Sequence, residues 1–586
     1  MAQMTTAHGR EAALAWLSSQ VAEERADAAA NARLLRGRLL LTMGRANEAR
    51  NDFEAGIGLT DKPGPLQFEL ARAHATLMDL AAAVDCLQLA VSWCPRAGDY
   101  WLELGSVLLR LDRVDEARES LQTARALLLA PATDQTPDTS EAAAIASATG
   151  DGQACVTDLL RCELRLSHAL IRLGLFAQAA DVLRSSVLHS PGVMEAWIAL
   201  GNAELLLDND IAAEAAYERA IGMSERPSAA VLLHHGVVCQ NLGRWDVARA
   251  QYEQIMRLEP GNDVARWYLC QAELALQHWQ IGWSLFSLRY KAGALKYRPM
   301  PFRPWDGRIA RDDTLLVLAD EGLGDEIMYA SCLRDAMARV GRCILECEPR
   351  LEALFRRSFP EALVVGTDRS ADIRWLNGLP APDWQISSGD LPRLLRPDAA
   401  SFEPAQAFLV PDPRRSRGWR DRLEADLGPG LKVGISWRGG TERTRTRARS
   451  LPLSQWAPIL GVPGVQFVSL QYGPVDADLA ELSATTGRSM VDYPAVHADY
   501  DDTAALVGAL DLVISVCTAV IHLAGGLGKP VWVLAPYAPS WRYGAYNTAM
   551  PWYPQVRVMR KTRYDSWDEL CHSVAADLAT LTNSVA

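Results

Sequence analysis

The feature that most constrains this chain is a spacing of about 34 residues between small side chains in its first half. The first small residue of the successive units is Gly37, Ala71, Gly105, Ser167, Gly201, Gly236 and Cys270. A second small residue follows in each unit, at Ala49, Ala83, Ala117, Ala179, Ala213, Ala248 and Gly282. Helices approach each other most closely where their side chains are small. The double spacing therefore predicts stacked pairs of antiparallel helices, a solenoid.

Large side chains follow the second small residue in most units, at Phe53, Leu87, Leu121, Leu183, Tyr217 and Tyr252. We expect them to fill the groove toward the next unit. The pattern resembles the tetratricopeptide repeat family over about residues 20–290, and its best unit, residues 197–221, reads WIALGNAELLLDNDIAAEAAYERAI. The resemblance implies a concave groove over residues 1–290 that holds a peptide or partner protein. A packing scaffold without a ligand is the alternative.

The repeat register breaks once, within residues 128–155. This stretch is rich in Ala, Thr, Ser, Asp and Gly, so we expect a disordered insertion between two sub-arrays. The last unit, residues 264–290, is rich in aromatic side chains and is typical of a capping repeat that docks on the next domain of the chain. Residues 296–308 are then expected to be a linker.

Composition excludes some classes of function. The formal net charge of −12 argues against non-specific binding to nucleic acid. The N-terminus lacks a basic segment followed by an apolar run, so we expect no signal peptide, and residues 511–536 carry charges and glycines unsuited to a membrane span. The eleven cysteines form no CxxC pair, and no partners complete a zinc set around Cys343 and Cys347. Free thiols in a reducing cytoplasm are the expectation.

Residues 511–536, DLVISVCTAVIHLAGGLGKPVWVLAP, predict a βαβ unit. A buried strand over 512–516 precedes a turn, a helix that carries His522 and ends at the following glycines, and a second strand over 531–534. A helix N-terminus at the carboxyl end of a strand can bind an anion. Thr518 begins this helix and His522 lies one turn further on the same face, so both are candidates for phosphate contact. A buried crossover without function is the other interpretation.

A second glycine turn follows the predicted strand over 315–318, in the sequence EGLGDE that precedes a helix expected at about 327–340. Gly322 and Gly324 allow close backbone approach to a ligand, but no full dinucleotide-binding pattern is present. Asp325 is either a helix-capping carboxylate or a general base that accepts a proton from a hydroxyl. Its neighbours Glu321 and Glu326 can shift its pKa.

Further strands are expected at 343–347 and 362–365, and residues 411–430 are expected to form a hinge between two α/β lobes. The second lobe begins with a strand over 431–437. Its loop RGGTERTRTRARS contains five arginines, Arg438, Arg443, Arg445, Arg447 and Arg449. Guanidinium groups match phosphate oxygens, so a bound anion is favoured over a solvated basic loop.

The next strand is expected over 465–470 and ends at Gln471, and a last helix is expected over 567–581. Asp476 and Asp478 form a DxD triplet that starts a helix, so we assign it no metal. The segment around Trp541 and Arg542 and the motif at 551–554 can wall a sugar or base pocket.

From about residue 283 to the C-terminus, the chain resembles bacterial GT-B glycosyltransferases of the tetratricopeptide-linked class. These enzymes are related to ADP-heptose:lipopolysaccharide heptosyltransferases and to O-linked N-acetylglucosamine transferases. The resemblance rests on GWSLFSLRY, PWDG, DEGLGDEIMYA, VGISWRGG, RSLPLSQW, VSLQYG, DTAALVGALDLVIS, HLAGGLGKPVWVL and PWYP. It implies two Rossmann-like lobes, residues 291–410 for the acceptor and 411–586 for a nucleotide-sugar donor, with no cofactor and no metal.

The resemblance also implies roles for single residues. Asp325 matches the base that activates the acceptor, and Gln471 matches a residue of the cleft. The positions matched to donor-phosphate contacts are Arg438, Arg449, Thr518 and His522. One position departs from the family pattern, because Cys517 stands where the family has an aspartate. This change can alter the donor that is accepted or weaken the enzyme.

These observations together predict a cytoplasmic protein O-glycosyltransferase that recruits its acceptor through the repeats and glycosylates Ser or Thr. Similar fusions modify flagellin with nonulosonic acids such as pseudaminic acid, so flagellin and a CMP-linked donor are the specific expectation. The alternatives are a non-enzymatic adaptor with a degenerate transferase half, a heptosyltransferase-like enzyme that acts on a glycan, and a sugar-nucleotide epimerase.

Overall fold

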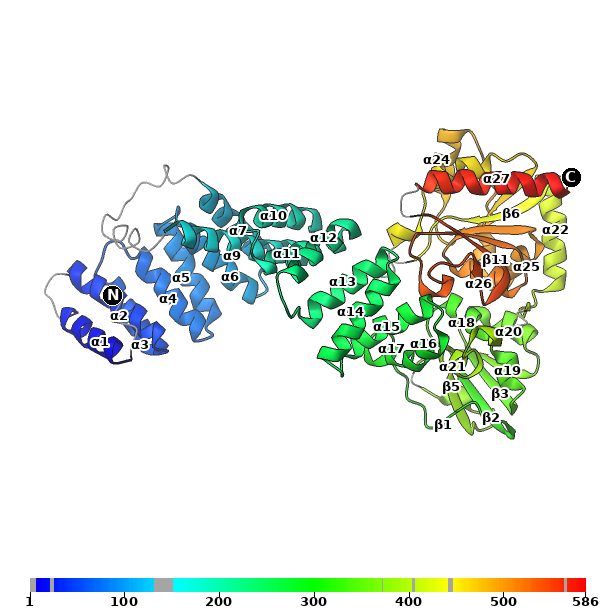
Figure 1. Ribbon diagram of the computed structural model, residues 1–586, viewed down its shortest axis with the longest axis horizontal. Helices are drawn as coiled ribbons and strands as arrows, with labels where there is room; N and C mark the ends of the chain where they lie inside the picture. The colour runs from blue at the N-terminus through cyan, green and yellow to red at the C-terminus, as the bar shows by residue number, and fades with distance from the viewer. Residues whose placement is uncertain are drawn as a thin grey trace. The chain divides into compact units, whose positions relative to one another are not determined.

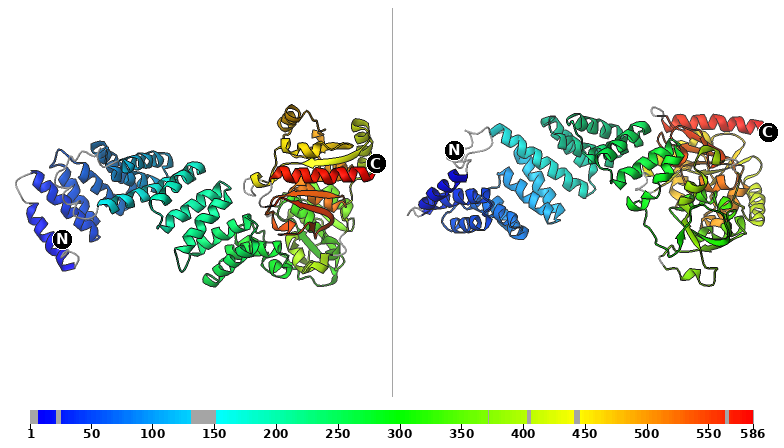
Figure 2. Two further views of the ribbon diagram at one scale, coloured as in Figure 1. Left: turned by 45° about the horizontal axis from the view of Figure 1, so that its top comes forward. Right: turned by 60° about the horizontal axis from the view of Figure 1, so that its bottom comes forward.

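The computed structural model describes residues 7–21, 26–130, 151–370, 372–402, 406–440, 446–562 and 566–585. Contacts divide the chain into two units, residues 1–227 and 228–586. Within these residues, Figures 1 and 2 show helices in the first unit and helices with two sheets in the second. Of the insertion expected at 128–155, residues 131–150 lie outside the described residues, and residues 128–129 and 151–155 belong to helices.

The first unit consists of antiparallel helix pairs. The described helices are α1 Ala7–Gln20, α2 Ala26–Thr42, α3 Ala46–Ile57, α4 Gly64–Thr76, α5 Leu80–Trp93, α6 Gly98–Arg110, α7 Val114–Leu129, α9 Asp151–Arg172, α10 Phe176–His189, α11 Met194–Leu206 and α12 Asp210–Gly222. Ala49, Ala83, Ala117, Ala179 and Ala213 are fully buried. The second small residue of each of these units thus lies inside the packed array, as the spacing predicted.

The first small residue of a unit makes room for the large side chain of the same helix pair. A Cβ built on Gly37 would lie 2.2 Å from the Phe53 ring, and one built on Gly201 would lie 2.7 Å from the Tyr217 ring. Phe53 also packs in a cluster with Leu66 of the following unit. The large residues therefore fill the crossing within their own pair as well as the groove toward the next, whereas we had expected only the groove.

Helices of the same kind continue into the second unit, as α13 Ala229–Asn241, α14 Trp245–Leu258, α15 Asp263–Ala275, α16 Trp279–Leu285 and α17 Leu288–Lys291. They pack on the sheet-containing part, since Trp283 Nε1 donates to the Arg396 carbonyl at 2.9 Å and the Ala545 amide donates to the Ala275 carbonyl at 2.7 Å. The expected domain boundary at residue 290 therefore falls within a compact unit, and the division by contacts comes earlier, between Pro227 and Ser228.

The first sheet has five parallel strands in the order β1-β5-β2-β3-β4. The strands are β1 Arg303–Pro304, β2 Ala310–Leu318, β3 Val340–Cys347, β4 Ala362–Gly366 and β5 Trp384–Ser387. The helices between them are α18 Leu323–Ala330, α19 Leu333–Met337, α20 Glu352–Ser358 and α21 Leu391–Leu395. The helix expected at about 327–340 begins at Leu323 and is divided in two, and β5 was not expected.

The second sheet has six strands in the order β10-β11-β9-β8-β6-β7, parallel except for the pair β10 and β11. The strands are β6 Leu431–Ser436, β7 Val465–Ser469, β8 Leu512–Val516, β9 Val531–Ala535, β10 Ala549–Met550 and β11 Tyr553–Arg560. The helices around it are α22 Pro413–Leu427, α23 Ala457–Leu460, α24 Asp476–Thr486, α25 Tyr500–Ala509, α26 Ala519–Gly526 and α27 Trp567–Val585. Every residue of β8 is buried.

The hinge expected at residues 411–430 is a helix instead. Asp412 caps α22 by accepting from the Arg414 and Arg415 amides, and Pro413 occupies the first turn, where it costs no hydrogen bond. Trp419 and Leu423, one turn apart, are buried and supply an apolar face. The sequence did not predict this helix because few of its residues are apolar and many are arginines.

The last helix, α27, covers one face of the second sheet, where its Cys571 and Val574 share a core cluster with Val433 and Leu512 (Figure 2). Among the described residues, no helix combines the length and the apolar character needed to cross a membrane.

Candidate functional site

A cavity of about 660 Å³ in the second unit brings together residues from the carboxyl ends of both sheets. Its lining contains Gly324, Asp325, Arg438, Gly439, Gly440, Thr446, Arg449, Gln471, Tyr472, Pro474, Cys517, Thr518, Ala519, His522, Ser540, Arg542 and Tyr543. Of the candidate site residues, the lining contains Gly324, Asp325, Arg438, Arg449, Gln471, Thr518 and His522, and it lacks Gly322, Trp541 and residues 551–554. Arg443 and Arg445 lie outside the described residues, as does the side chain of Arg447.

The two glycines of the first turn differ in what they permit. A Cβ on Gly324 would lie 3.1 Å from His522 Cδ2 and 3.2 Å from the Cα of Ala519, so this glycine lets α18 approach α26. A Cβ on Gly322 would meet only an Asp325 oxygen, at 3.4 Å, and its φ of −97° suits any residue. Only Gly324 is required for close approach.

Both oxygens of the Asp325 carboxylate accept hydrogen bonds. The Gly322 amide donates to Oδ2 at 3.3 Å, which satisfies one free amide at the start of α18. Arg542 Nε donates to Oδ1 at 2.5 Å. Asp325 thus has the capping role that the sequence allowed and also points into the cavity.

Arg542 is a residue of the site whose role the sequence interpretation missed. It was assigned only to a pocket wall, yet its Nη2 also donates to Glu321 Oε2 at 2.6 Å. It lies 217 positions from Asp325 in the chain, and no local sequence pattern predicts a pair so far apart. Its guanidinium also lies 4.6 Å from the Trp541 ring centroid.

Glu321 is the second carboxylate bound by Arg542. Its backbone has a φ of 59°, a left-handed conformation uncommon outside glycine, which the Arg369 guanidinium supports by donating to its carbonyl at 2.6 Å. Burial and the Asp325 charge raise the pKa of Glu321 above its usual range, against the effect of Arg542. Glu326 accepts from the Glu348 amide and pairs with Arg369. Neither glutamate belongs to the cavity lining, and Glu321 reaches the site through Arg542.

The N-terminus of α26 opens onto the cavity at Thr518 and Ala519. Thr518 has extended backbone, and its hydroxyl lies 3.0 Å from Ser515 Oγ instead of capping the helix. Gly439, which the sequence interpretation did not single out, packs on this turn. A Cβ there would lie 2.7 Å from Thr518 Cγ2 and 2.8 Å from the Cys517 carbonyl oxygen.

His522 lies at the cavity but carries no charge near neutral pH. Burial lowers the pKa of its imidazole to about 4. Its Nδ1 lies 3.2 Å from the Tyr553 hydroxyl, and where that hydroxyl donates, the hydrogen of the ring is on Nε2. His522 can therefore act as a neutral hydrogen-bond donor, but it supplies no positive charge for a phosphate.

Two further predicted residues use their polar groups within the protein. Gln471 Oε1 accepts from the amides of Trp437 at 3.0 Å and Arg438 at 2.8 Å, so it holds the loop after β6. The Arg438 guanidinium pairs with Asp478 at 2.9 Å and donates to the Pro474 carbonyl at 2.6 Å. The guanidinium is thus directed toward α24 and not toward the donor-phosphate position that the resemblance implied. Asp476 and Asp478 lie in the first turn of α24, as the sequence predicted.

Arg449 and Cys517 meet at the turn before α26. Arg449 Nη2 donates to the Cys517 carbonyl at 2.9 Å, which places the guanidinium beside the helix N-terminus. Burial raises the pKa of the Cys517 thiol to about 11, so the side chain is a neutral thiol. It lines the cavity without the negative charge of the aspartate expected from the resemblance.

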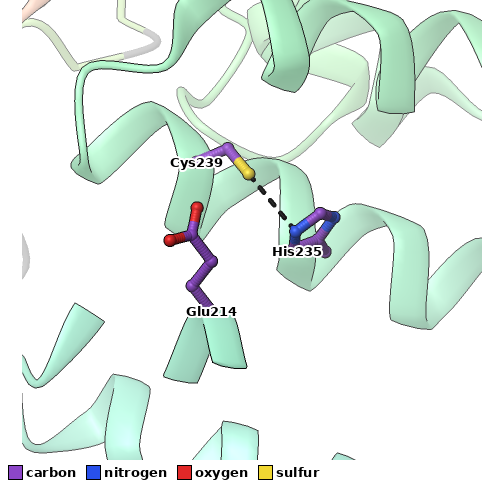
Figure 3. Close-up of side chains that lie close together, drawn as sticks. All are labelled: Glu214, His235 and Cys239. Atoms are coloured by element: carbon purple, nitrogen blue, oxygen red, sulfur yellow. Dashed lines mark hydrogen bonds between the residues drawn. The ribbon is translucent and has the colours of Figure 1, made fainter. Parts of the chain in front are cut away.

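A buried pair outside this cavity also contains side chains of the metal-binding type. Cys239 Sγ lies 3.4 Å from His235 Nε2, one turn away on α13 (Figure 3). Glu214, drawn in the same figure, belongs to α12 of the first unit. We assign no metal to the pair on α13, because structural zinc sites use four protein ligands and catalytic ones three.

Comparison with known proteins supports the repeats and identifies a relative. The family model "Tetratricopeptide repeat" matches residues 68–128 and 164–230. Protein FlbA from Caulobacter vibrioides is 32% identical over 435 residues, which span 70% of this chain and 72% of FlbA. The chain belongs to the FlbA family. Since the match to FlbA spans most of both chains, the family extends well beyond the segments matched by the repeat model.

Solved structures with partial likeness to this FlbA-family chain include PilF from Pseudomonas aeruginosa, with 17% identity, a TM-score of 0.31, and coverage of 40% of this chain and 95% of PilF. The type IV pilus biogenesis factor PilW has 17% identity, a TM-score of 0.32, and coverage of 41% and 96%. The tetratricopeptide repeat protein YrrB has 14% identity, a TM-score of 0.29, and coverage of 36% and 95%. Scores this low support no functional statement.

Proposed function

We propose that this FlbA-family chain is a GT-B glycosyltransferase that transfers a sugar from a nucleotide-sugar donor to a protein hydroxyl. The observation that carries the proposal is the single cavity that unites Asp325 of the first glycine turn with Thr518 and His522 of the βαβ unit. Asp325 follows a strand of the first sheet, Thr518 and His522 follow a strand of the second, and the residues were selected from separate motifs. Ligands of parallel α/β sheets bind at the carboxyl ends of the strands, where this cavity lies.

The donor phosphate is assigned to the N-terminus of α26. Backbone amides there, the helix dipole and the Thr518 hydroxyl all favour an anion. Arg449 adds a fixed positive charge beside them through its bond to the Cys517 carbonyl. Gly439 lets the loop after β6 lie close to this turn, and Gln471 holds that loop in place.

The acceptor hydroxyl is assigned to Asp325. The carboxylate takes the hydroxyl proton while the acceptor oxygen forms a bond to the anomeric carbon of the donor sugar. The bond from that carbon to the phosphate oxygen breaks, and its electron pair leaves with the phosphate. Positive groups around the departing phosphate supply the electrostatic stabilisation.

The acceptor is assigned to the protein class because of the repeats. Helical arrays of this kind present extended concave surfaces that suit protein partners, and an enzyme for a free glycan has no need of one. The resemblance to tetratricopeptide-linked transferases of flagellin supports flagellin as the acceptor and a CMP-linked nonulosonic acid, such as pseudaminic acid, as the donor.

The test is an assay with the purified full chain, flagellin and a CMP-linked nonulosonic acid. Asp325→Asn should lower the rate of sugar transfer by about 10²–10⁴-fold, because a general base contributes about that factor. Flagellin binding should be unchanged. Asp335→Asn is the matched control, since Asp335 is half exposed and outside the cavity lining. Transfer by Asp325→Asn at the wild-type rate would remove Asp325 from the mechanism.

A non-enzymatic adaptor is the second candidate, and the observation that favours it is the neutral thiol of Cys517 in the cavity. An adaptor would bind flagellin without consuming any donor. The same assay separates the two, because donor consumption by the wild-type chain excludes the adaptor. Donor conversion without flagellin would instead indicate an epimerase.

A further inference from the structure

Arg542 connects the two halves of the cavity. It belongs to the short 3₁₀ segment Trp541–Tyr543, between β9 and β10 of the second sheet, yet its guanidinium bonds to Asp325 and Glu321 of the first sheet's half. Its third nitrogen, Nη1, donates to Ser540 Oγ at 3.1 Å. The side chain is 20% exposed, and it lines the same cavity as Thr518 and Arg449.

In this arrangement the Arg542 guanidinium occupies one hydrogen-bonding position of the cavity-lining Asp325 carboxylate. Oδ1 accepts from Arg542 and Oδ2 accepts from the Gly322 amide. The amide is a fixed part of the helix start, whereas the arginine is a side chain that can change partner. Movement of Arg542 therefore opens that position on Oδ1 to an acceptor hydroxyl.

A phosphate in the cavity offers Arg542 such a partner. Guanidinium groups bind phosphate oxygens through paired, charge-assisted hydrogen bonds, as they do carboxylates. Both the guanidinium and the proposed phosphate position at Thr518 belong to the lining of one cavity. Asp325 and Glu321 repel each other when both are charged, and the positive charge of Arg542 between them offsets that repulsion.

We propose that Arg542 is a positioning residue that opens Asp325 Oδ1 to the acceptor hydroxyl once the donor has bound. Before donor binding the guanidinium holds Asp325 and Glu321 together. A donor phosphate draws it toward α26 and frees Asp325 Oδ1 for the acceptor hydroxyl. This inference rests on the proposed function and adds an order to it, with the donor bound before the acceptor reacts.

The movement has a consequence that binding experiments can detect. Arg542 lowers the pKa of Glu321, and its departure lets that pKa rise further. Near neutral pH, Glu321 should then take up a proton as the phosphate binds. The other charged and titratable groups near Glu321 are Asp325 and Tyr329 of α18, Asp320 after β2, Arg289 of α17, Cys270 of α15, and Arg369, which binds its carbonyl.

The test is isothermal titration of the full chain with CMP and with inorganic pyrophosphate at pH 7.5, in buffers of different ionisation enthalpy. The wild-type chain should take up a fraction of a proton on binding, and Glu321→Gln should lose most of that uptake while still binding. Arg542→Gln should bind about tenfold more weakly, the effect of losing one charge-assisted hydrogen bond. Arg542→Lys keeps the charge and should recover part of the affinity.

Arg557→Gln is the control arginine, because its side chain is 55% exposed and pairs with Asp577 away from the cavity. Proton uptake in Glu321→Gln equal to that of the wild type, or unchanged affinity in Arg542→Gln, would overturn the role of Arg542 and leave the transferase proposal standing. Failure of the wild-type chain to bind any nucleotide or pyrophosphate would overturn both. Melting temperatures near that of the wild type would show that each variant is folded.

Discussion

His522 illustrates how burial decides what a residue can do at this site. Its position one turn into α26 was predicted from the sequence, but its charge was not, because burial depends on side chains from distant segments. Tyr553 and Tyr543 both lie beside its ring, with centroids 5.8 Å and 6.2 Å away. The neutral imidazole suits hydrogen bonding to a sugar or phosphate oxygen better than charge neutralisation.

The pKa of His522 predicts a pH dependence of stability. In the folded state His522 binds its second ring proton only below about pH 4, because its pKa is lowered, whereas in the unfolded chain it binds that proton near pH 6.5. The unfolding free energy should therefore rise with pH between about 4 and 6.5 and lose this contribution as pH falls. The unfolding free energy above pH 6.5 should exceed that below pH 4 by about 3 kcal/mol from this residue. The groups facing the ring are Asp325, Arg542, Arg449, Tyr543 and Tyr553.

The measurement is urea unfolding of wild type and His522→Gln at a series of pH values in this window. The variant should show a smaller increase in stability with pH, because glutamine does not titrate. Parallel curves for the two proteins would contradict the low pKa of His522.

At the scale of elements, the contact between α18 and α26 sets the width of the site. Gly324 is the close point, where His522 and Ala519 lie against the first turn of α18. Gly324→Ala should destabilise the second unit by about 1–2 kcal/mol, because the added methyl group meets helix backbone that must move. Transfer activity should fall with it, since Asp325 is the next residue.

Gly322→Ala is the matched control, because its Cβ has ordinary space and its backbone angles suit alanine. Melting temperatures and transfer rates of the two variants should differ clearly. Equal effects of both substitutions would show that the contact between α18 and α26 does not control the site.

Sequence patterns predicted some elements better than others. The helix pairs followed from a spacing that repeats, and β2, β6 and β8 followed from apolar runs bounded by turns. The helix α22 was mistaken for a hinge, since its buried face rests on few residues among many arginines. The side chains of Arg438 and Arg542 point toward partners far along the chain, Asp478 and Asp325, and no local sequence pattern predicts those orientations.

At the scale of the whole molecule, two compact units carry the two tasks of the proposal. The described residues of the first unit, 1–227, form helix pairs, and tetratricopeptide repeats are typical of protein binding. The second unit, residues 228–586, contains both sheets and the cavity. Binding of the acceptor protein and transfer of the sugar should therefore be separable by substitution, with Asp325→Asn defective in transfer alone.

The most direct test of protein glycosylation is the intact mass of flagellin from cells with and without this gene. Deletion should remove sugar-sized mass increments from flagellin. The wild-type gene should restore them, whereas the Asp325→Asn variant, expressed at the same level, should not. A flagellin mass that is unchanged on deletion would contradict the assignment of flagellin as acceptor, and full restoration by Asp325→Asn would contradict the proposed chemistry.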